Sequence, residues 1–394
     1  MSNVLVLGSG RVGSVIVADL AADMEVVVVD NSIESLDNVR GENITRVHRA
    51  DCVRKETIRE LLGTYNPQIV IGALPSKLGY DALRQVIEAG YNYVDISFMK
   101  EDPRKLDQLA REHCVTAVVD MGIMPGLGNI FVGHAVAKMN EDARFKCTHF
   151  KISVGGVLTN PQPPFYYKAG FAPSDVIEEY VRPARMKING NVVTLAALTD
   201  VEPINFPGIG LYEEFNTDGL RTLLDLDVDN MVEKTIRRPG HAELMRVFRD
   251  AGFFRKEGCV IVQTTHGLAQ VCPLDVTQKL LFPHWKMEEG DEDITLMRVT
   301  ASSSNPTEKM LWWNIKVSYG WKEGCTSMSR ATAYPCTTVA RLILEGKILQ
   351  TGVIVPETLG ADSEIFAEII RRVSAKGIVI DTTTCCPVTS GPHR

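Results

Sequence analysis

Short apolar runs alternate with amphipathic segments over the first 120 residues of the chain. Strands are predicted at 4–7, 26–30, 45–49, 69–72, 93–96 and 116–120, and helices at 11–22, 55–62, 80–89 and 103–112. Strands that alternate with helices indicate an α/β fold with a parallel sheet covered on both faces. Six such strands fit the doubly wound Rossmann order, in which a ligand binds at the carboxyl ends of the strands.

The pattern changes after the Gly122–Gly126 turn. A helix is predicted at about 127–139, followed by strand-like runs at 150–154, 192–195, 232–236, 260–263, 294–299 and 311–317. Long connections between these runs indicate a second, α+β domain with a largely antiparallel sheet. An amphipathic helix pattern returns near 328–344 and is expected to pack against the first domain. The predicted divisions are 1–125, 126–325, 326–380 and a flexible tail at 381–394.

Composition narrows the class of protein. The 394 residues include 45% hydrophobic and 23% charged residues, which suggests two globular domains. A net charge of -7 without a long basic run gives no support for a nucleic-acid or anionic-membrane partner. No apolar stretch has the length of a membrane span, and the first residues enter a strand directly, so a cytoplasmic protein is expected. Nine scattered cysteines without C-x-x-C spacing fit a reducing compartment, and no metal site is expected.

The strongest motif is a glycine-rich turn between the first predicted strand and helix. Gly8 permits a tight turn, Gly10 lets the backbone approach a pyrophosphate at the helix N-terminus, and Gly13 allows close helix packing. Asp30 ends the next strand and can accept hydrogen bonds from a ribose 2′-hydroxyl, which favours NAD over NADP. The alternative is a glycine-rich turn that binds nothing. The expected cofactor contacts in and after this turn are Gly8, Gly10, Arg11, Val12, Gly13 and Asp30.

Other strand ends face the same edge of the predicted sheet. Asp51 and Cys52 follow the third strand, either near the adenine or as part of a polar turn. Leu74 and Pro75 follow the fourth strand and are expected to run along the cofactor toward the nicotinamide.

Two aspartates end the fifth and sixth predicted strands. Asp95 and Asp120 are therefore expected to face one crevice, where neighbouring carboxylates raise each other's pKa and suit proton transfer. The alternative for each aspartate is the capping of a turn or helix.

One charged cluster stands out in the second domain. Arg237 and His241 lie around a turn and could clamp a carboxylate beside a titratable ring. On the residues alone, a surface turn with solvated charges is favoured over such a site. Tyr167 lies in a proline-stiffened loop that forms either a pocket wall or a simple connection. No phosphate-binding P-loop and no G-x-S-x-G nucleophile motif occurs.

The order of several motifs resembles the saccharopine dehydrogenase superfamily, and within it the L-lysine 6-dehydrogenase group. The resemblance extends from about residue 3 to 380. Its motifs include VLGSG at 6–10, GALP at 72–75, VDISFM at 94–99, DMGIMPG at 120–126, PPFYYK at 163–168, RPAR at 182–185, DGLR at 218–221, RRPGH at 237–241 and SMSR at 327–330.

The resemblance implies a Rossmann domain joined to a substrate-binding domain that forms a homodimer. It also implies NAD-dependent oxidation of an amino acid at a carbon bearing nitrogen. Arg237 would then clamp the substrate carboxylate, Asp120 or His241 would accept the amine proton, and Asp95 and Tyr167 would orient the amine.

The substrate expectation depends on one departure from the family pattern. Met124 stands where saccharopine dehydrogenases carry an acid, which favours a smaller substrate, the ε-amine of L-lysine. The alternatives are a saccharopine or carboxynorspermidine dehydrogenase, an NAD-binding protein without turnover, and a structural dimer partner with a relict glycine loop.

Overall fold

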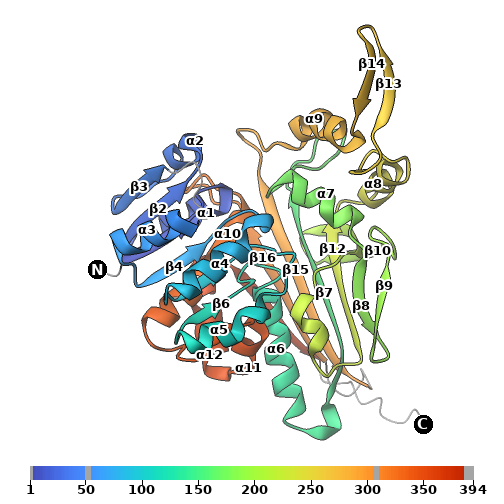
Figure 1. Cartoon of the computed structure of the whole chain (residues 1–394). Helices are drawn as coiled ribbons and strands as arrows, with labels where there is room; N and C mark the ends of the chain where they lie inside the picture. Colours follow the sequence, from blue (N-terminus) through green and yellow to red (C-terminus); the bar gives the residue numbers. More distant parts are fainter. Residues whose placement is uncertain (1–2, 49–54, 305–309, 386–394) are drawn as a thin grey trace, which may run out of the picture. The chain divides into compact units, whose positions relative to one another are not determined.

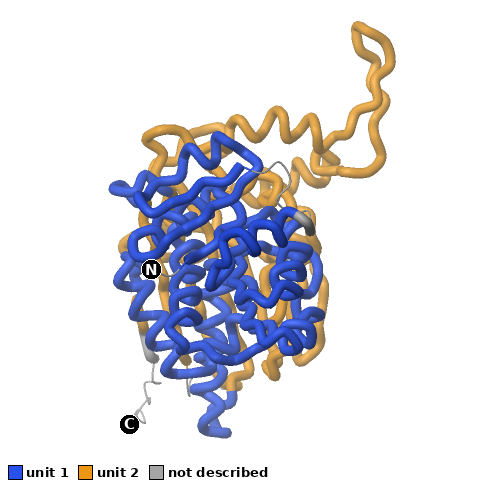
Figure 2. Tube along the Cα trace, turned by 60° about the vertical axis from the view of Figure 1, so that its left-hand side comes forward, with its two compact units in different colours: residues 1–146, 320–325, 329–380 blue, residues 147–319, 326–328, 381–394 orange. Residues whose placement is uncertain are grey.

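The computed structural model describes residues 3–48, 55–304 and 310–385. The chain divides into two compact units (Figure 2). The first comprises residues 1–146, 320–325 and 329–380, and the second comprises 147–319, 326–328 and 381–394.

Within its described residues, the first unit contains a seven-stranded parallel sheet (Figure 1). Its strands, in spatial order, are β17 (Gly352–Ile354), β6 (Thr116–Val118), β5 (Tyr93–Asp95), β4 (Ile69–Gly72), β1 (Asn3–Leu7), β2 (Glu25–Asp30) and β3 (Ile44–His48). Residues on both faces of β1, β2 and β4 are buried, which explains their continuous apolar runs. The predicted doubly wound order is confirmed, and β17 is an additional edge strand beside β6.

The predicted helices of the first unit are present, with ends shifted by up to four residues, and three further helices, at Ile33–Asp37, Pro356–Ala361 and Ser363–Ala375, were not predicted. Together, the helices are α1 (Arg11–Leu20), α2 (Ile33–Asp37), α3 (Lys55–Tyr65), α4 (Ser76–Glu88), α5 (Asp107–Glu112), α6 (Leu127–Asn140), α11 (Pro356–Ala361), α12 (Ser363–Ala375) and, from Ser329 onward, α10 (Ser327–Leu344).

The first unit extends beyond the expected boundary at residue 125, because α6 packs closely on α11. A Cβ atom on Gly133 would lie 2.0 Å from the carbonyl oxygen of Glu357, and one on Gly360 would lie 2.0 Å from that of Ile130. Only glycine permits such an approach of two helix backbones. The C-terminal segment is also tied to α1, since Arg341 contacts Asp19 at 2.7 Å.

The second unit is built on a nine-stranded mixed sheet. Its main path is β10 (Glu202–Phe206), β11 (Gly210–Asn216), β12 (Asn230–Arg237), β7 (Cys147–Leu158), β15 (Asp293–Ser303), β16 (Met310–Ser318) and β18 (Val379–Cys385), with β8 (Ala184–Ile188) pairing β12 and β9 (Asn191–Leu195). β12 and β7 pair in parallel, whereas β11–β12, β7–β15 and β15–β16 are antiparallel. Helices α7 (Pro173–Val181), α8 (His241–Asp250) and α9 (Pro273–Trp285) and a hairpin, β13 (Val260–Thr264) with β14 (Gly267–Val271), complete the unit.

The expected flexible tail is wrong for residues 381–385. These residues belong to β18, which joins the sheet beside β16. Consecutive β-branched residues, Thr382–Thr384, favour an extended strand that a composition argument overlooks. In the part of the chain that the structure describes, no helix has the length and apolar character needed to cross a membrane.

Candidate functional site

The glycine-rich turn joins β1 to α1, and each glycine has a different environment. Gly8 has a φ of 101°, and a Cβ there would lie 2.4 Å from the carbonyl oxygen of Ala73. A Cβ on Gly13 would lie 2.2 Å from the carbonyl oxygen of Gly8. At Gly10, by contrast, a Cβ would meet no atom within 4 Å. Gly8 and Gly13 are therefore required by the fold itself, whereas Gly10 leaves open space at the N-terminus of α1.

That open space has the character of an anion-binding site. Gly10 is the N-cap of α1 and provides no side-chain cap, and the first turn contains no acidic residue. The first backbone N–H groups of a helix have no partner within the helix, and the helix dipole favours negative charge there. Arg11 and Val12 begin this turn of α1, as predicted for residues near a pyrophosphate.

Asp30 is held at the end of β2 by the turn itself. One carboxylate oxygen accepts hydrogen bonds from the backbone N–H of Ser9 at 2.7 Å and from its hydroxyl at 3.1 Å. The other oxygen accepts the backbone N–H of Ser32 at 2.8 Å. The carboxylate is thus fixed beside the glycine-rich turn before any ligand arrives, and its negative charge lies where a dinucleotide ribose is expected.

Of the four remaining predicted cofactor contacts, the structure describes two. Leu74 and Pro75 lie between β4 and α4, after Ala73, and the backbone carbonyl of Leu74 accepts the hydroxyl of Ser97 at 2.9 Å. This bond fixes the segment between β4 and α4 against the end of β5. Asp51 and Cys52 lie outside the described residues.

Asp95 is the last residue of β5, Asp120 lies two residues beyond the end of the neighbouring β6, and both are buried, with at most 1% exposure. Asp95 accepts the Tyr93 hydroxyl at 2.8 Å and the Ser97 backbone N–H at 2.6 Å. Burial, together with the nearby charge of Asp120, raises the pKa of Asp95 to about 8. The bond from Ser97 is the turn-capping contact that was one of the two predicted alternatives. Asp95 is fully buried, and its hydrogen bonds with Tyr93 and Ser97 stabilise the end of β5.

The raised pKa of Asp95 predicts a specific pH dependence of folding stability. The unfolded carboxyl releases its proton near pH 3.9, but the folded one does so only near pH 8. Between these values the folded state holds an extra proton, so stability falls as pH rises, by about 1.4 kcal/mol per pH unit from this group. The Asp95→Asn variant should therefore show a shallower decline between pH 5 and 8 in denaturant unfolding. Parallel curves for the two proteins would contradict the assignment. Burial also raises the pKa of Glu233 to about 8, so Glu233 gives the same pH dependence of stability in the wild-type protein and in Asp95→Asn.

In the second unit, the structure brings together the three predicted residues Arg237, His241 and Tyr167. Arg237 ends β12, His241 begins α8, and Tyr167 lies in the loop after β7. The Arg237 guanidinium carbon is 5.0 Å from the Tyr167 ring centroid, and the Tyr167 and His241 rings are 4.9 Å apart. All three side chains are buried, so the alternative of a solvated surface turn is wrong.

Sequence reasoning missed the partners that α7 supplies. The Tyr180 hydroxyl is 2.8 Å from Nε2 of His241, and Arg237 Nε donates to the same hydroxyl at 3.4 Å. Another Arg237 nitrogen donates to the Glu179 carboxylate at 3.0 Å. The Tyr180 hydroxyl therefore joins Arg237 and His241 in one hydrogen-bonded chain. A substrate carboxylate bound by Arg237 would compete with Glu179 for the guanidinium.

Glu213 on β11 is a second missed residue, and it positions His241. Its two carboxylate oxygens accept the backbone N–H groups of Gly240 and Ala242, each at 2.7 Å. A carboxylate at the first turn of α8 is favoured by the helix dipole. Gly240 has a φ of 90°, which turns the chain sharply between β12 and α8. Glu213 therefore fixes the point at which His241 enters the cluster.

The electrostatics of this cluster favour a neutral imidazole. Burial and the positive charge of Arg237 hold the pKa of His241 well below its ordinary value. Burial raises the pKa of the Tyr167 phenol to about 12. The ring centroids of Trp285 and Tyr167 are 5.3 Å apart in an edge-to-face arrangement. The buried indole N–H of Trp285 has no hydrogen-bond partner among the described residues. Buried donors in native proteins are normally satisfied, so a bound polar group or water is expected here.

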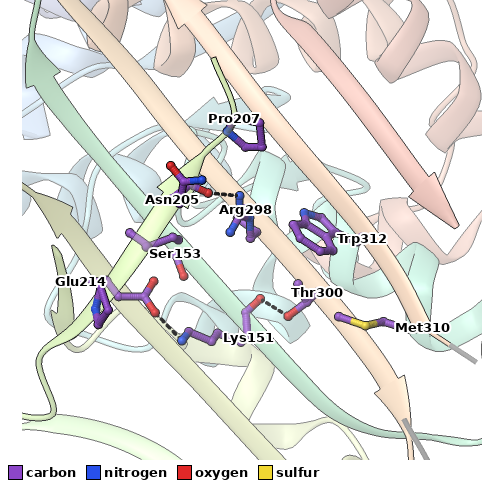
Figure 3. Close-up of a pocket in the computed structure, with 11 residues that line it drawn as sticks. Lys151, Ser153, Asn205, Pro207, Glu214, Arg298, Thr300, Met310 and Trp312 are labelled. Carbon is purple, nitrogen blue, oxygen red and sulfur yellow. Dashed lines mark hydrogen bonds and ion pairs between the residues drawn. The ribbon is translucent and has the colours of Figure 1, made fainter. Parts of the chain in front are cut away.

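The opposite face of the same sheet carries a pocket that none of the predicted residues line (Figure 3). It has a volume of about 500 Å³. Lys151 pairs with Glu214 there, and the Arg298 guanidinium lies 4.6 Å from the Trp312 ring. Successive residues of a strand point to opposite faces, which explains why Glu213 supports His241 while Glu214 lines the pocket.

Comparison with known proteins identifies both parts of the chain. Residues 4–118 match the family model "Saccharopine dehydrogenase NADP binding domain", and residues 122–378 match "Saccharopine dehydrogenase C-terminal domain". These matches confirm the resemblance to the saccharopine dehydrogenase superfamily that was inferred from the motifs.

Individual relatives are distant. A mitochondrial alpha-aminoadipic semialdehyde synthase of Bos taurus is 22% identical, over 96% of this chain and 47% of the relative. The chain thus spans about half the length of that relative. A saccharopine dehydrogenase [NADP(+), L-glutamate-forming] of Pyricularia oryzae is 19% identical, over 77% of this chain and 82% of the relative. The solved apo saccharopine dehydrogenase (L-Glu forming) of Saccharomyces cerevisiae has the same fold, with a TM-score of 0.79 at 16% identity over 98% of this chain and 100% of that one.

Proposed function

Because the chain belongs to the saccharopine dehydrogenase family, we propose that it is a nicotinamide-dependent oxidoreductase acting on the C–N bond of an amino acid. The observation that carries this proposal is the glycine-rich turn, where Gly10 leaves open space at an uncapped helix N-terminus beside a fixed Asp30. A pyrophosphate fits the backbone N–H groups of α1, and Asp30 fits the ribose hydroxyls. When bound, the nicotinamide would supply the hydride acceptor.

We propose NAD as the cofactor, although the matched family model is named for NADP. Asp30 supports this choice, because its carboxylate repels a 2′-phosphate and accepts bonds from a 2′-hydroxyl. Replacing Asp30 by Asn should shift the ratio of NAD to NADP affinity toward NADP by about tenfold, or ~1.4 kcal/mol. Calorimetric titration of both proteins with both cofactors measures the ratio. A wild-type protein that already prefers NADP would overturn the choice.

We propose the ε-amine of L-lysine as the reacting group. A lysine ammonium has a pKa of about 10.4 and no lone pair, so it must lose a proton before its carbon can release hydride. His241 is neutral, although the low pKa of its ring opposes protonation, and Asp120, two residues beyond the end of β6, is the other candidate acceptor. Arg237 would bind the substrate carboxylate in exchange for Glu179, and Tyr167 would help to orient the amine. Asp95 is fully buried and would act only through the strand end that it supports.

Oxidation of saccharopine is the second candidate, since the relatives named above include a saccharopine dehydrogenase. Met124, in place of an acidic residue, supports the smaller substrate instead. A homodimer and a cytoplasmic location also remain predictions.

The experiment that separates these possibilities follows nicotinamide reduction spectrophotometrically at mildly alkaline pH. Lysine, saccharopine and polyamine-type compounds are each supplied with NAD or with NADP. Lysine-dependent reduction of NAD supports the proposal, and reduction with saccharopine alone replaces it with the second candidate. Cofactor binding without turnover of any amino acid would instead indicate a binding protein.

A further inference from the structure

The hairpin formed by β13 and β14 projects from the second unit between α8 and α9 (Figures 1 and 2). Ile261 on β13 is 70% exposed, and Leu268 on β14 is 74% exposed. A two-stranded hairpin without further packing is only marginally stable in water. Whatever joins its two strands at the base therefore determines how rigid it is.

Two cysteines occupy that base. The last paired residues of the ladder are Val260 and Val271, so Cys259 and Cys272 are next on the two strands. A two-residue loop makes Thr264 and Gly267 a hydrogen-bonded pair, and such pairs alternate with non-hydrogen-bonded ones along the ladder. Continuing this alternation one residue beyond the Val260–Val271 pair puts Cys259 opposite Cys272 at a non-hydrogen-bonded position. The Cα atoms of such pairs are about 4.5 Å apart, within the range that a disulfide spans.

The two thiols differ in access. Both are free; Cys259 is exposed, and Cys272 is half-buried. The Cys272 sulfur lies 3.7 Å from the carbonyl oxygen of Arg255 and 3.6 Å from that of Lys256. An oxidant in solution therefore reaches Cys259 first. Cys272, on the opposite side of the hairpin base, is the thiol that can then form the disulfide with Cys259.

We propose that Cys259 and Cys272 form a reversible thiol–disulfide site that locks the base of the hairpin. With a small-molecule disulfide such as oxidised glutathione, the Cys259 thiolate attacks one sulfur and releases one glutathione. The Cys272 thiolate then attacks the Cys259 sulfur and releases the second. The chain loses two hydrogens overall, and the oxidant becomes two thiols. This proposal does not depend on the proposed function.

The location links the site to the Arg237 cluster. Cys272 is the N-cap of α9, and α9 ends at Trp285, which packs on Tyr167. A disulfide between Cys259 and Cys272 would therefore restrain the start of α9, and the other end of α9 packs on Tyr167.

Mass spectrometry of the full chain tests the site. After incubation with oxidised glutathione, free thiols are alkylated and the protein is digested with trypsin. Cleavage after Lys256 and Lys279 leaves both cysteines in one peptide, 257–279. The expected peptide is two hydrogens lighter than the dithiol form and takes up alkylating reagent only after reduction. A peptide with both thiols alkylated, or with a glutathione on each, would overturn the proposal.

Two variants serve as controls. Cys259→Ser, at an exposed position, should abolish the crosslinked peptide, whereas Cys114→Ser, also exposed, should leave it intact. Chymotrypsin cleaves near Leu268, between the two cysteines. In the oxidised protein the two resulting fragments should stay joined by the disulfide until a reductant is added. A crosslinked peptide that persists in Cys259→Ser, or fragments that separate without reduction, would contradict the assignment.

Discussion

The Gly10→Ala variant is expected to fold like the wild-type protein and to bind nicotinamide dinucleotides about 100-fold more weakly, a loss of ~3 kcal/mol. Its φ of -61° is open to alanine, and the added Cβ meets no protein atom within 4 Å. That methyl group would instead fill the space through which a pyrophosphate reaches the first N–H groups of α1. Thermal unfolding measures the fold, and calorimetry measures the affinity.

Two other glycines give matched controls. A Cβ on Gly63 of α3 would also meet no atom within 4 Å, so Gly63→Ala should leave both stability and binding intact. Gly13→Ala should destabilise the protein, because its Cβ would lie 2.2 Å from the carbonyl oxygen of Gly8. Unchanged cofactor affinity in Gly10→Ala would show that the dinucleotide binds elsewhere.

Replacement of Arg237 by alanine is expected to destabilise the protein by about 1–3 kcal/mol, as well as to remove activity. Arg237 is 3% exposed, and its loss removes the ion pair with the partly exposed Glu179 and the hydrogen bond to the buried Tyr180 hydroxyl. Denaturant unfolding measures the stability, and steady-state kinetics measure the activity.

The double variant Arg237→Ala, Glu179→Gln separates the two effects. Because it removes the uncompensated charge, it should recover part of the lost stability. Activity should stay absent, since the proposed carboxylate contact is still missing. If the double variant regained activity together with stability, Arg237 would be a structural residue only.

The sequence predicted the first unit more closely than the second, for a physical reason. β1, β2 and β4 are buried on both faces and therefore read as continuous apolar runs. β10 and β11 were missed because neither forms an apolar run: β10 is exposed at Glu202, Pro203 and Asn205, and β11 contains the polar residues Glu213, Glu214 and Asn216. β17, at Gly352–Ile354, was also missed.

The candidate site was predictable only where local spacing fixes geometry. The turn from Gly8 to Gly13 and the acid at Asp30 follow from the strand–turn–helix sequence. Tyr180 and Glu179 could not be found in this way, because their contacts to Arg237 and His241 join helix α7 to residues more than 50 positions later. An amphipathic pattern in α7 would have indicated a buried face but not its partner.

Calorimetric titration of the whole chain with NAD, repeated on Gly10→Ala, tests the central claim most directly. The account predicts one NAD per chain in the wild-type protein, tighter than NADP, and a large loss of affinity in the variant. Absence of NAD binding, or binding that the added methyl group leaves unchanged, would contradict it.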